Sequence, residues 1–451
     1  MSAIHIRGFS GCSVDVRRLE AADIDWYRNG PKGQTTTNVD AAAVIGGRQT
    51  AETRGDETAA GRREGQGQRS LSGAAPQLSD CQPGMQIVVK TSFDDPGCGA
   101  ASSVRLLRQG AKQVEFCAWN PLPGRVVAPA ILCSRLETVL TSYLAKPSAL
   151  GSAGGGDVAA PVAAAAAASV SSGLGPSQQR AVLVMPFVPH SDALTFLTHA
   201  NVDRVQVFVR TIIDVLQAYL TVSPVSRIDL SVWRNKVADV RNVCRRNPVI
   251  CPPHRGDPKE AAPPPPTPLW ACVERSCGLL DTWVNTCEQR GEGLSLPLGR
   301  CHGDLTLSNL LMRENRGGPQ NLSADVGDAG AAAGSFTVVL IDFLDAFLES
   351  PLLDMAKLNQ DLRFGWTLRM MSGEDRARVD KVRLFLVFEA AAKSIRQTFG
   401  HFDWYRRAFR PATVLNQLRV LQYAKDADIA NYLAFTVDAE LESWRHEGGC
   451  A

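Results

Sequence analysis

Residues 301–311 read CHGDLTLSNLL, and residues 338–354 read VVLIDFLDAFLESPLLD. In the first stretch Asn309 follows Asp304 by five residues, in a loop that comes after the apolar run LSLPLG. In the second stretch Asp342 comes directly after FTVVLI, whose apolar and β-branched residues predict a strand. We therefore expect a hairpin in which a polar loop and a polar strand end carry Asp304, Asn309 and Asp342.

These three side chains have the chemistry that phosphoryl transfer from ATP to a hydroxyl requires. Such a site needs a carboxylate that orients the attacking hydroxyl and accepts its proton, and groups that neutralise the phosphate charge. Mg²⁺ prefers carboxylate, amide and phosphate oxygens. Asp304 fits the role of the carboxylate, and the side-chain oxygens of Asn309 and Asp342 fit the roles of metal ligands.

The two stretches, HGDLTLSN and LIDFLDAFLESPLLDMAKL, resemble the aminoglycoside phosphotransferase and choline kinase-like family, a branch of the protein-kinase-like fold. That family carries H-G-D-x-x-x-x-N followed by a strand ending in I-D-[FW]-x-[DE], and both halves are present here in order. The resemblance implies Asp304 as catalytic base and Asn309 and Asp342 as Mg²⁺ ligands. It also implies supporting residues around the loop, namely His302, Asp345 and Asp354.

The resemblance further implies an α+β, bilobal protein-kinase-like fold, with a β-rich ATP-binding lobe followed by a helical lobe. We place the first domain at 1–188 and the second at 189–451. Expected strands lie within 3–19, 85–92, 126–132, 181–188 and 336–341, and expected helices at 104–119, 203–220, 230–246, 269–288, 352–363, 374–398 and 411–443. The helix expected at 203–220 has one apolar face, formed by Val205, Phe208, Ile212, Val215, Leu216 and Tyr219. Polar, Gly/Ala-rich or Pro-rich stretches predict mobile insertions at 30–84, 146–180, 247–268 and 314–335.

In the first domain, Lys90 ends the apolar run IVVK of an expected strand. The resemblance places a lysine here that reaches the α- and β-phosphates of ATP, while the alternative is an ordinary lysine at a strand edge. Kinases orient this lysine with a glutamate on the following helix. The helix expected at 104–119 offers Glu115 and Gln113, but the sequence does not fix its phase, so Glu115 is equally compatible with a solvated position.

A turn rich in glycine and serine, GFSGCS at 8–13, separates the two halves of the alternating stretch 3–19. Backbone amides of Gly11, Cys12 and Ser13 could close over phosphates, as successive N–H groups do in anion-binding turns. The alternative is a plain hairpin turn, which is the commoner meaning of such a sequence.

The stretch MPFVPHSD at 185–192 follows an expected strand and precedes a helical region. Its order in the chain predicts the hinge between the lobes, where adenine would bond backbone groups of Met185, Phe187 and Val188. Simple packing of these apolar residues is the alternative.

Departures from the protein-kinase pattern favour a small-molecule acceptor. Protein kinases carry a lysine two positions after the loop aspartate, where this chain has Thr306, and no APE-like activation segment follows DFLD. We interpret Asp361, Arg363 and Trp366 as surface and packing residues of a helix, and lining of the acceptor pocket is the alternative. A nucleotide-binding pseudokinase or scaffold is the rival interpretation, and a protein kinase is a less favoured one.

Bulk properties bound the remaining function classes. The chain has 451 residues, 45% hydrophobic and 21% charged, with a formal net charge of +2. This balance argues against a protein built mainly to bind nucleic acid or an anionic membrane. None of the twelve cysteines forms a CxxC pair, and no signal-peptide core or membrane-length apolar run is present. We therefore expect a cytoplasmic protein that acts on a small-molecule hydroxyl, with any protein partner unknown.

Overall fold

The computed structural model describes nine ranges of the chain, and the chain forms two compact units. The described ranges are 4–7, 12–20, 36–37, 84–93, 102–140, 177–253, 266–291, 293–315 and 336–447. Most of the four predicted insertions lies outside these ranges, and so does Gly11. Unit 1 comprises Met1–Glu115 and Pro129–Phe187, and unit 2 comprises Phe116–Ala128 and Val188–Ala451.

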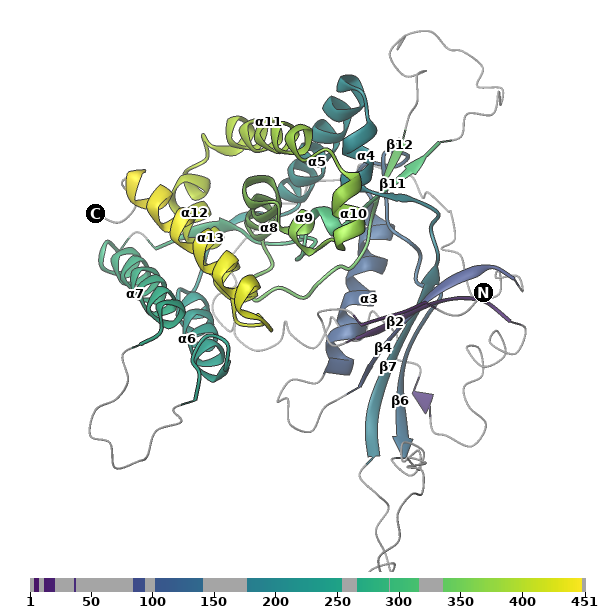
Figure 1. Cartoon of the computed structure of the whole chain (residues 1–451), viewed down its shortest axis with the longest axis horizontal. Helices are drawn as coiled ribbons and strands as arrows, with labels where there is room; N and C mark the ends of the chain where they lie inside the picture. Colours follow the sequence, from purple (N-terminus) through teal and green to yellow (C-terminus); the bar gives the residue numbers. More distant parts are fainter. Residues whose placement is uncertain are drawn as a thin grey trace, which may run out of the picture. The chain divides into compact units, whose positions relative to one another are not determined.

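Unit 1 contains an antiparallel six-stranded sheet of order β1-β2-β4-β7-β6-β3. The alternation within residues 3–19 forms a hairpin in which Ile4 pairs with Val16. Figure 1 shows β2, β4, β7 and β6 of this sheet beside the long helix α3. The elements are β1 (Ile4–Arg7), β2 (Ser13–Arg18), β3 (Thr36–Thr37), β4 (Gln86–Phe93), α3 (Ser102–Trp119), β6 (Cys133–Leu140) and β7 (Ser177–Pro186).

The two faces of this sheet carry separate apolar clusters. Ile87 and Val89 of β4 belong to one cluster, while Leu183 of β7 belongs to the other, together with Leu106 and Leu107 of α3. A Cβ at Gly110 of α3 would lie 2.6 Å from Leu183 Cδ1, so Leu183 would have to move if residue 110 carried a side chain. Glycine thus permits the close approach of α3 to β7.

One strand expectation needs correction. Residues 126–132 were expected to form a single strand, but only β5 (Val126–Val127) is extended in a ladder, and the next strand begins at Cys133. Pro129 interrupts the stretch, because proline has no N–H to donate to a ladder. The β5 strand pairs in parallel with β12 of unit 2, which matches Val126 with Val338.

Unit 2 combines two small sheets with the helices of the C-terminal part. One sheet has the order β5-β12-β11-β8 and the other pairs β10 with β9. The strands are β8 (Ser191–Asp192), β9 (Val225–Arg227), β10 (Ser295–Pro297), β11 (Leu310–Glu314) and β12 (Phe336–Leu340). The helices are α4 (Ala193–His199), α5 (Val202–Thr221), α6 (Ser231–Arg246), α7 (Pro268–Gln289), α8 (Pro351–Phe364), α9 (Trp366–Met370), α10 (Gly373–Arg378), α11 (Lys381–Phe399), α12 (Asp403–Leu421) and α13 (Ala427–His446), with the 3₁₀ turn η4 (Leu307–Asn309).

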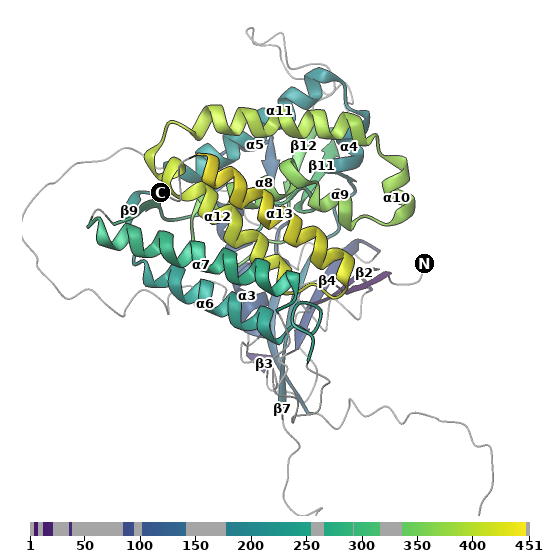
Figure 2. The same cartoon turned by 60° about the vertical axis from the view of Figure 1, so that its left-hand side comes forward.

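The helices of unit 2 pack around one apolar core. Figure 2 shows α6 beside α7 and α12 beside α13, and these pairs are in contact. The predicted apolar face of α5 is buried at Phe208, Ile212, Val215, Leu216 and Tyr219. Apolar side chains at this spacing lie on one face of a helix, which is why the sequence revealed it.

Two helical regions are interrupted where the sequence suggested continuity. The region 374–398 divides into α10 and α11 at Asp380, whose side chain accepts a hydrogen bond from Arg383 N. The region 411–443 divides into α12 and α13, with Asp426 accepting from Ile429 N. Aspartate favours such N-terminal caps because it satisfies an N–H that has no partner within the helix.

The structure confirms the predicted α+β class, with antiparallel strands in the N-terminal region and helices in the C-terminal part. Among the described helices, none is both long and apolar enough to cross a lipid bilayer.

Candidate active site

The segment 301–309 forms a tight loop that brings Asp304 and Asn309 together. Asn309 Nδ2 donates to the backbone oxygen of Asp304 at 2.8 Å and to its carboxylate Oδ2 at 3.1 Å. The backbone N–H of Thr306 also donates to the Asp304 carbonyl, at 2.8 Å. Both bonds from the Asn309 side chain use its nitrogen, so the loop itself does not engage the amide oxygen.

Two buried carboxylates of α8 hold this loop by its backbone. Asp354 accepts hydrogen bonds from His302 N at 2.6 Å and Gly303 N at 2.7 Å. Asp361 accepts from Leu307 N at 2.7 Å. Neither carboxylate is exposed to solvent. Burial raises the pKa of Asp361 above its ordinary value, against the opposing effect of its backbone donors.

The end of β12 is fastened to the same loop. Ile341 N donates to the Asn309 carbonyl at 3.1 Å, and His302 Nε2 lies 2.9 Å from the Ile341 carbonyl. His302 is fully buried, and its carbonyl accepts from Leu344 N at 3.0 Å. These bonds bring the start of the DFLD segment next to the loop that carries Asp304.

Asp342 has an unusual backbone conformation. Its φ is +61°, and it is the one residue other than glycine in the described part of the chain with a positive φ. Aspartate and asparagine tolerate this left-handed region better than other side chains, but such residues still store strain and cluster at functional sites. The conformation lets the chain turn sharply where β12 ends.

The Asp304 carboxylate is paired with Lys357 of α8. Lys357 Nζ lies 2.9 Å from Asp304 Oδ1, and the two side chains are 13% and 22% exposed. Burial acts to raise the pKa of Asp304, but the charge and hydrogen bond of Lys357, with help from His302 and Asn309, outweigh burial and lower that pKa. Asp304 is therefore ionised at neutral pH.

Sequence reasoning missed the part played by Lys357 and Asp361. Both follow Asp354 on α8, at three and seven residues, so the three polar residues share one face of a helix that is otherwise largely apolar. That spacing, read together with the HGD loop, could have marked the face of α8 that meets the loop. We had instead interpreted Asp361, Arg363 and Trp366 as surface and packing residues, with lining of an acceptor pocket as the alternative.

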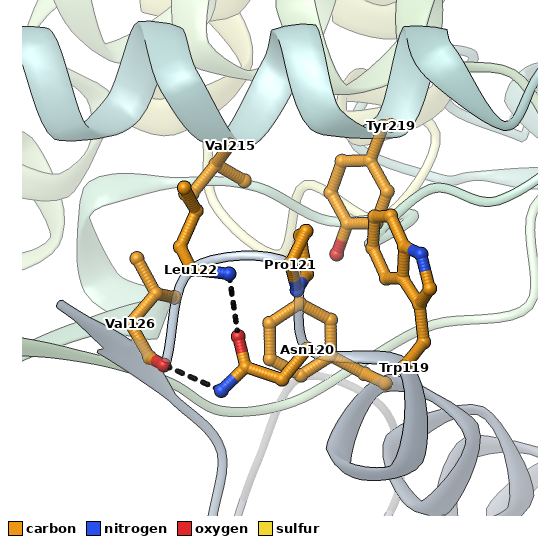
Figure 3. A pocket seen from close by; sticks show the side chains of 8 residues that line it. Trp119, Asn120, Pro121, Leu122, Val126, Val215 and Tyr219 are labelled. Carbon is orange, nitrogen blue, oxygen red and sulfur yellow. Dashed lines mark hydrogen bonds between the residues drawn. The ribbon is translucent and has the colours of Figure 1, made fainter. Parts of the chain in front are cut away.

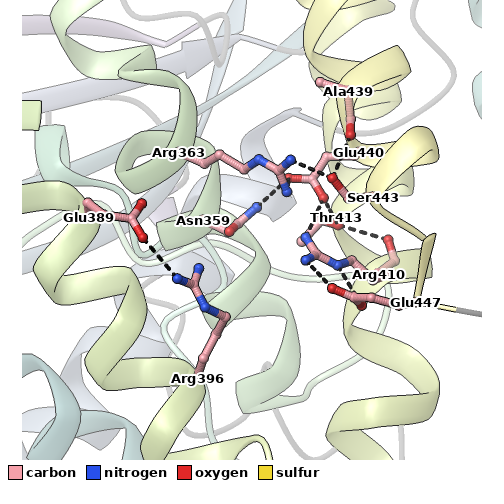
Figure 4. A network of polar contacts seen from close by, with 10 residues as sticks. All are labelled: Asn359, Arg363, Glu389, Arg396, Arg410, Thr413, Ala439, Glu440, Ser443 and Glu447. Carbon is pink, nitrogen blue, oxygen red and sulfur yellow. Dashed lines mark hydrogen bonds and ion pairs between the residues drawn. The ribbon is translucent and has the colours of Figure 1, made fainter. Parts of the chain in front are cut away.

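The contacts of Asp361 and Arg363 fit the helix-packing interpretation. Asp361 is fully buried and bonds to backbone N–H groups of Leu307 and Thr367. Arg363 belongs to the polar network of Figure 4, where its guanidinium lies 3.3 Å from Glu440 and donates to Ser443. Packing and internal pairing therefore account for both side chains.

The side chains of Asn309 and Asp342 have the donor atoms that a hard metal ion such as Mg²⁺ prefers. An amide oxygen and a carboxylate are the donors that Mg²⁺ accepts, with its remaining positions filled by phosphate and water. Among the described residues, no cluster of three or more His, Cys, Asp or Glu side chains could hold a metal ion. The Mg²⁺ site that we consider here has only two protein ligands, Asn309 and Asp342, and nucleotide phosphates would complete it, so it differs from such a cluster. Asp345 lies three residues beyond Asp342, and its supporting role stays a prediction.

Lys90 lies in the interior of the unit 1 sheet, which excludes the strand-edge interpretation. It pairs with Val14 on one side and Leu183 on the other, and it is 8% exposed. Since directly paired residues point to the same face, Lys90 shares the face of Leu183, which α3 covers. On α3, Gln113 is buried and donates to the Pro129 carbonyl at 2.6 Å, whereas Glu115 is half-buried. The pairing of Glu115 with Lys90 stays a prediction.

The predicted phosphate turn is only partly described. Cys12 is buried in the cluster on the α3 side of the sheet, and Ser13 begins β2, where its hydroxyl lies 2.5 Å from that of Thr91. Gly11 lies outside the described residues. The side chains of Cys12 and Ser13 thus have packing roles, and a phosphate contact there would come from the backbone.

The predicted adenine segment coincides with the passage from unit 1 to unit 2, since the boundary falls between Phe187 and Val188. Met185 is buried near the end of β7. Phe187 N donates to the Gln86 carbonyl at 3.0 Å, and the Val188 carbonyl is bonded to the His190 ring. Adenine recognition would therefore have to use other backbone groups here or displace these bonds.

A small apolar pocket in unit 2 is distinct from this constellation (Figure 3). Trp119, Leu122, Val126 and Tyr219 are among its lining residues, and Asn120 holds its rim by donating to the Val126 carbonyl at 2.9 Å. Its lining carries no charged side chain that could meet a phosphate. We therefore assign no part of the candidate active site to it.

Comparison with known proteins gives similar structures but no family assignment. No family model matches the chain, and no curated protein matches it. A thermostable mutant of an aminoglycoside phosphotransferase is 13% identical, covering 80% of this chain and 88% of its own, with a TM-score of 0.40. A glucosamine kinase is 13% identical over 98% and 93%, with a TM-score of 0.40. An ethanolamine kinase of Plasmodium vivax is 11% identical over 81% and 78%, with a TM-score of 0.32.

By name, these three structures are a phosphotransferase and two kinases that act on small molecules. Because the TM-scores are below 0.5, the site is assigned on its own contacts and not on these likenesses.

Proposed function

We propose that the protein is an ATP- and Mg²⁺-dependent phosphotransferase that moves the γ-phosphoryl group of ATP to a hydroxyl of a small molecule. A sugar, an amino alcohol or a related metabolite is the class of acceptor that we propose. Small acceptors are favoured over a protein substrate by Thr306, which stands where protein kinases carry lysine, and by the absence of an APE-like segment from the sequence.

One observation carries the proposal: a single hydrogen-bonded unit joins the carboxylate of Asp304, the amide of Asn309 and the strand end before Asp342. The backbone of the loop in this unit is held by hydrogen bonds to Asp354 and Asp361 of α8. Phosphoryl transfer depends mainly on positioning and on charge neutralisation, so rigid placement of few groups is what the reaction needs.

In the proposed reaction, Asp304 accepts a hydrogen bond from the acceptor hydroxyl and orients its oxygen toward the γ-phosphorus. As the new P–O bond forms, the bond to the β-phosphate oxygen breaks and ADP leaves with the electron pair. The hydroxyl proton passes to the Asp304 carboxylate. Asn309 and Asp342 would hold Mg²⁺, which supplies neutralisation of the phosphate charge.

The proposed nucleotide contacts in unit 1 begin with Lys90, whose ammonium group would meet the α- and β-phosphates. Its place on an interior strand, on the sheet face that α3 covers, supports this, because the family pattern has its phosphate-binding lysine on such a strand. Backbone groups of 185–188 would bond adenine.

The test is ATP turnover by purified protein with Mg²⁺, using separate pools of sugars, amino alcohols and aminoglycosides. We expect one pool to stimulate ADP formation, and Asp304→Asn to reduce the stimulated rate by about 10² to 10⁴-fold. Asp239→Asn is the matched control, because it removes a carboxylate that is 52% exposed and paired only with Lys236 on the surface of α6.

Each outcome has a separate meaning. Turnover that is lost in Asp304→Asn but kept in Asp239→Asn supports the proposal. Tight binding of Mg²⁺·ATP with no turnover in any pool would favour a nucleotide-binding pseudokinase. Failure of the folded wild-type protein to bind ATP would refute the proposal.

A further inference from the structure

The ion pair of Lys357 and Asp304 has a feature that a simple structural salt bridge does not require. Lys357 Nζ bonds to Oδ1 of Asp304, while Asn309 bonds to Oδ2, so the lysine occupies the carboxylate oxygen that the loop leaves open. Asp304 is its partner among the described residues. An ammonium group has three N–H donors, so one bond to Asp304 leaves two for a bound ligand.

The part of α8 that carries Lys357 is fixed against the loop on both sides of this residue. Asp354, three residues before it, bonds to the backbone at His302 and Gly303, and Asp361, four residues after it, bonds to Leu307. These bonds fix the helix face against the loop at both ends of the loop. The ammonium group is therefore presented at a defined position beside Asp304, with 13% of the side chain exposed.

Charge explains why such a group is needed. Asp304 is an anion, and a phosphoryl group in transit spreads negative charge over its three outer oxygens, so the two repel each other on approach. A cation beside Asp304 offsets this repulsion. The residue two positions after Asp304 offers none, because Thr306 is uncharged and its hydroxyl lies 2.8 Å from that of Ser308.

We infer that Lys357 is a catalytic residue that binds the phosphoryl group during transfer, while Asp304, with which it forms an ion pair, orients the acceptor hydroxyl. This inference rests on the proposed function. Lys357 stays protonated throughout: the acceptor oxygen forms the new bond to phosphorus, ADP departs with the electron pair of the broken bond, and Asp304 takes the hydroxyl proton. The lysine gives hydrogen bonds to the phosphoryl oxygens and transfers no proton.

Binding of a transition-state analogue tests the inference without knowledge of the acceptor. Mg²⁺·ADP with aluminium fluoride mimics the phosphoryl group in transit, and analogues of this kind bind more tightly than ground-state ligands. We would measure the dissociation constant of Mg²⁺·ADP with and without fluoroaluminate by calorimetry. For Lys357→Met, the dissociation constant of Mg²⁺·ADP alone should stay within about twofold of the wild-type value. The factor by which fluoroaluminate lowers that dissociation constant should be smaller than in wild type by on the order of 10²-fold.

A double variant separates a phosphoryl contact from mere neutralisation of Asp304. If Lys357 only offsets the Asp304 charge, Lys357→Met will have no further effect in an Asp304→Asn background. If Lys357 contacts the phosphoryl group, the tightening by fluoroaluminate will fall again in that background. Lys393→Met, an exposed lysine of α11, is the control. Lys357→Arg covers the case in which the methionine variant fails to fold, and it should restore part of the tightening.

Besides the absence of a further effect in the Asp304→Asn background, two results would overturn the inference, and they are distinguishable. Unchanged fluoroaluminate binding in folded Lys357→Met, while wild type shows the tightening, removes Lys357 from the phosphoryl site and leaves the proposed function standing. Absence of Mg²⁺·ADP binding in wild type removes the proposed function itself.

Discussion

At the scale of single residues, Asp342 combines a strained backbone with a proposed metal-binding side chain. Its positive φ follows directly after Ile341, whose N–H is bonded to the Asn309 carbonyl. Asparagine adopts this conformation as readily as aspartate, whereas alanine does not. The two substitutions therefore separate the backbone requirement from the carboxylate requirement.

We predict that Asp342→Asn keeps the wild-type stability within about 0.5 kcal/mol and loses Mg²⁺-dependent nucleotide binding. Asp342→Ala should lose the same binding and also about 1 kcal/mol of stability, because alanine is strained at this φ. Urea unfolding and a Mg²⁺ titration of ATP binding provide the two measurements. Unaltered Mg²⁺ dependence in Asp342→Asn would show that the carboxylate does not bind the metal.

The sequence revealed the residues of the loop and strand end because their chemistry and spacing are local. Asp304, Asn309 and Asp342 lie in two short stretches, and the loop contacts follow from five-residue spacing. Lys357 could not be placed in the same way, because its bond to Asp304 depends on how α8 rotates against the loop. Rotation of a helix about its axis is set by tertiary packing and not by propensity.

At the scale of elements, the buried carboxylate of Glu440 ties α8, α12 and α13 together (Figure 4). It accepts hydrogen bonds from Asn359 at 2.8 Å, Arg410 at 2.9 Å and Thr413 at 3.2 Å, and it has no solvent exposure. A buried ion pair adds little net stability over an apolar replacement, but removing one partner leaves the other uncompensated.

We predict that Glu440→Gln lowers the free energy of unfolding by about 3 kcal/mol, because the Arg410 guanidinium, only 12% exposed, would lose its fully buried charged partner and keep only the pairing with Glu447, which is 54% exposed. Urea denaturation monitored by far-UV circular dichroism measures this. Glu442→Gln, two residues on and 74% exposed, should change stability by less than about 0.5 kcal/mol. Equal effects of the two substitutions on stability would mean that the buried contacts of Glu440 do not stabilise the protein.

The packed pair α6 and α7 gives a prediction about thiol reactivity. Burial raises the pKa of Cys244, Cys272 and Cys277 to about 12 in each case. The thiolate is the reactive form, so these three should resist iodoacetamide in the native protein at pH 8 and gain reactivity only as pH approaches 12 or as the helices unfold. Mass spectrometry of tryptic peptides, with half-buried Cys251 as reference, measures the labelling. Rapid labelling of all three at pH 8 in native buffer would contradict this.

Helix existence was predictable from apolar periodicity, whereas helix ends were not. The face of α5 was identified residue by residue, but the breaks at Asp380 and Asp426 fall within stretches whose composition favours helix on both sides. At those points an aspartate caps the start of the second helix, and the same residue type is also common within exposed helix surfaces. The polar contacts of Glu440 leave no periodic pattern in the sequence from which they could be predicted.

At the scale of the whole molecule, the division into two units depends on pairings between distant parts of the sequence. Phe116–Ala128 belongs to unit 2, since β5 within it pairs with β12. Local patterns supplied the β-rich and helical regions but contain no information on this parallel pairing. The proposed function assigns the α- and β-phosphates to Lys90 and Mg²⁺ to Asn309 and Asp342, which lie far from Lys90 in the sequence.

Binding of Mg²⁺ with a non-hydrolysable ATP analogue should therefore slow amide hydrogen exchange in both units. A ligand at 100 times its dissociation constant stabilises the native state by about 2.7 kcal/mol, which corresponds to roughly 10²-fold slower exchange through global opening. We expect local protection in β4 and in residues 301–315, beyond that of α6 and α7. In Lys90→Met the protection of β4 should disappear while that of 301–315 persists at saturation. Protection confined to unit 2 in the wild type would remove Lys90 from the nucleotide site, whatever the turnover.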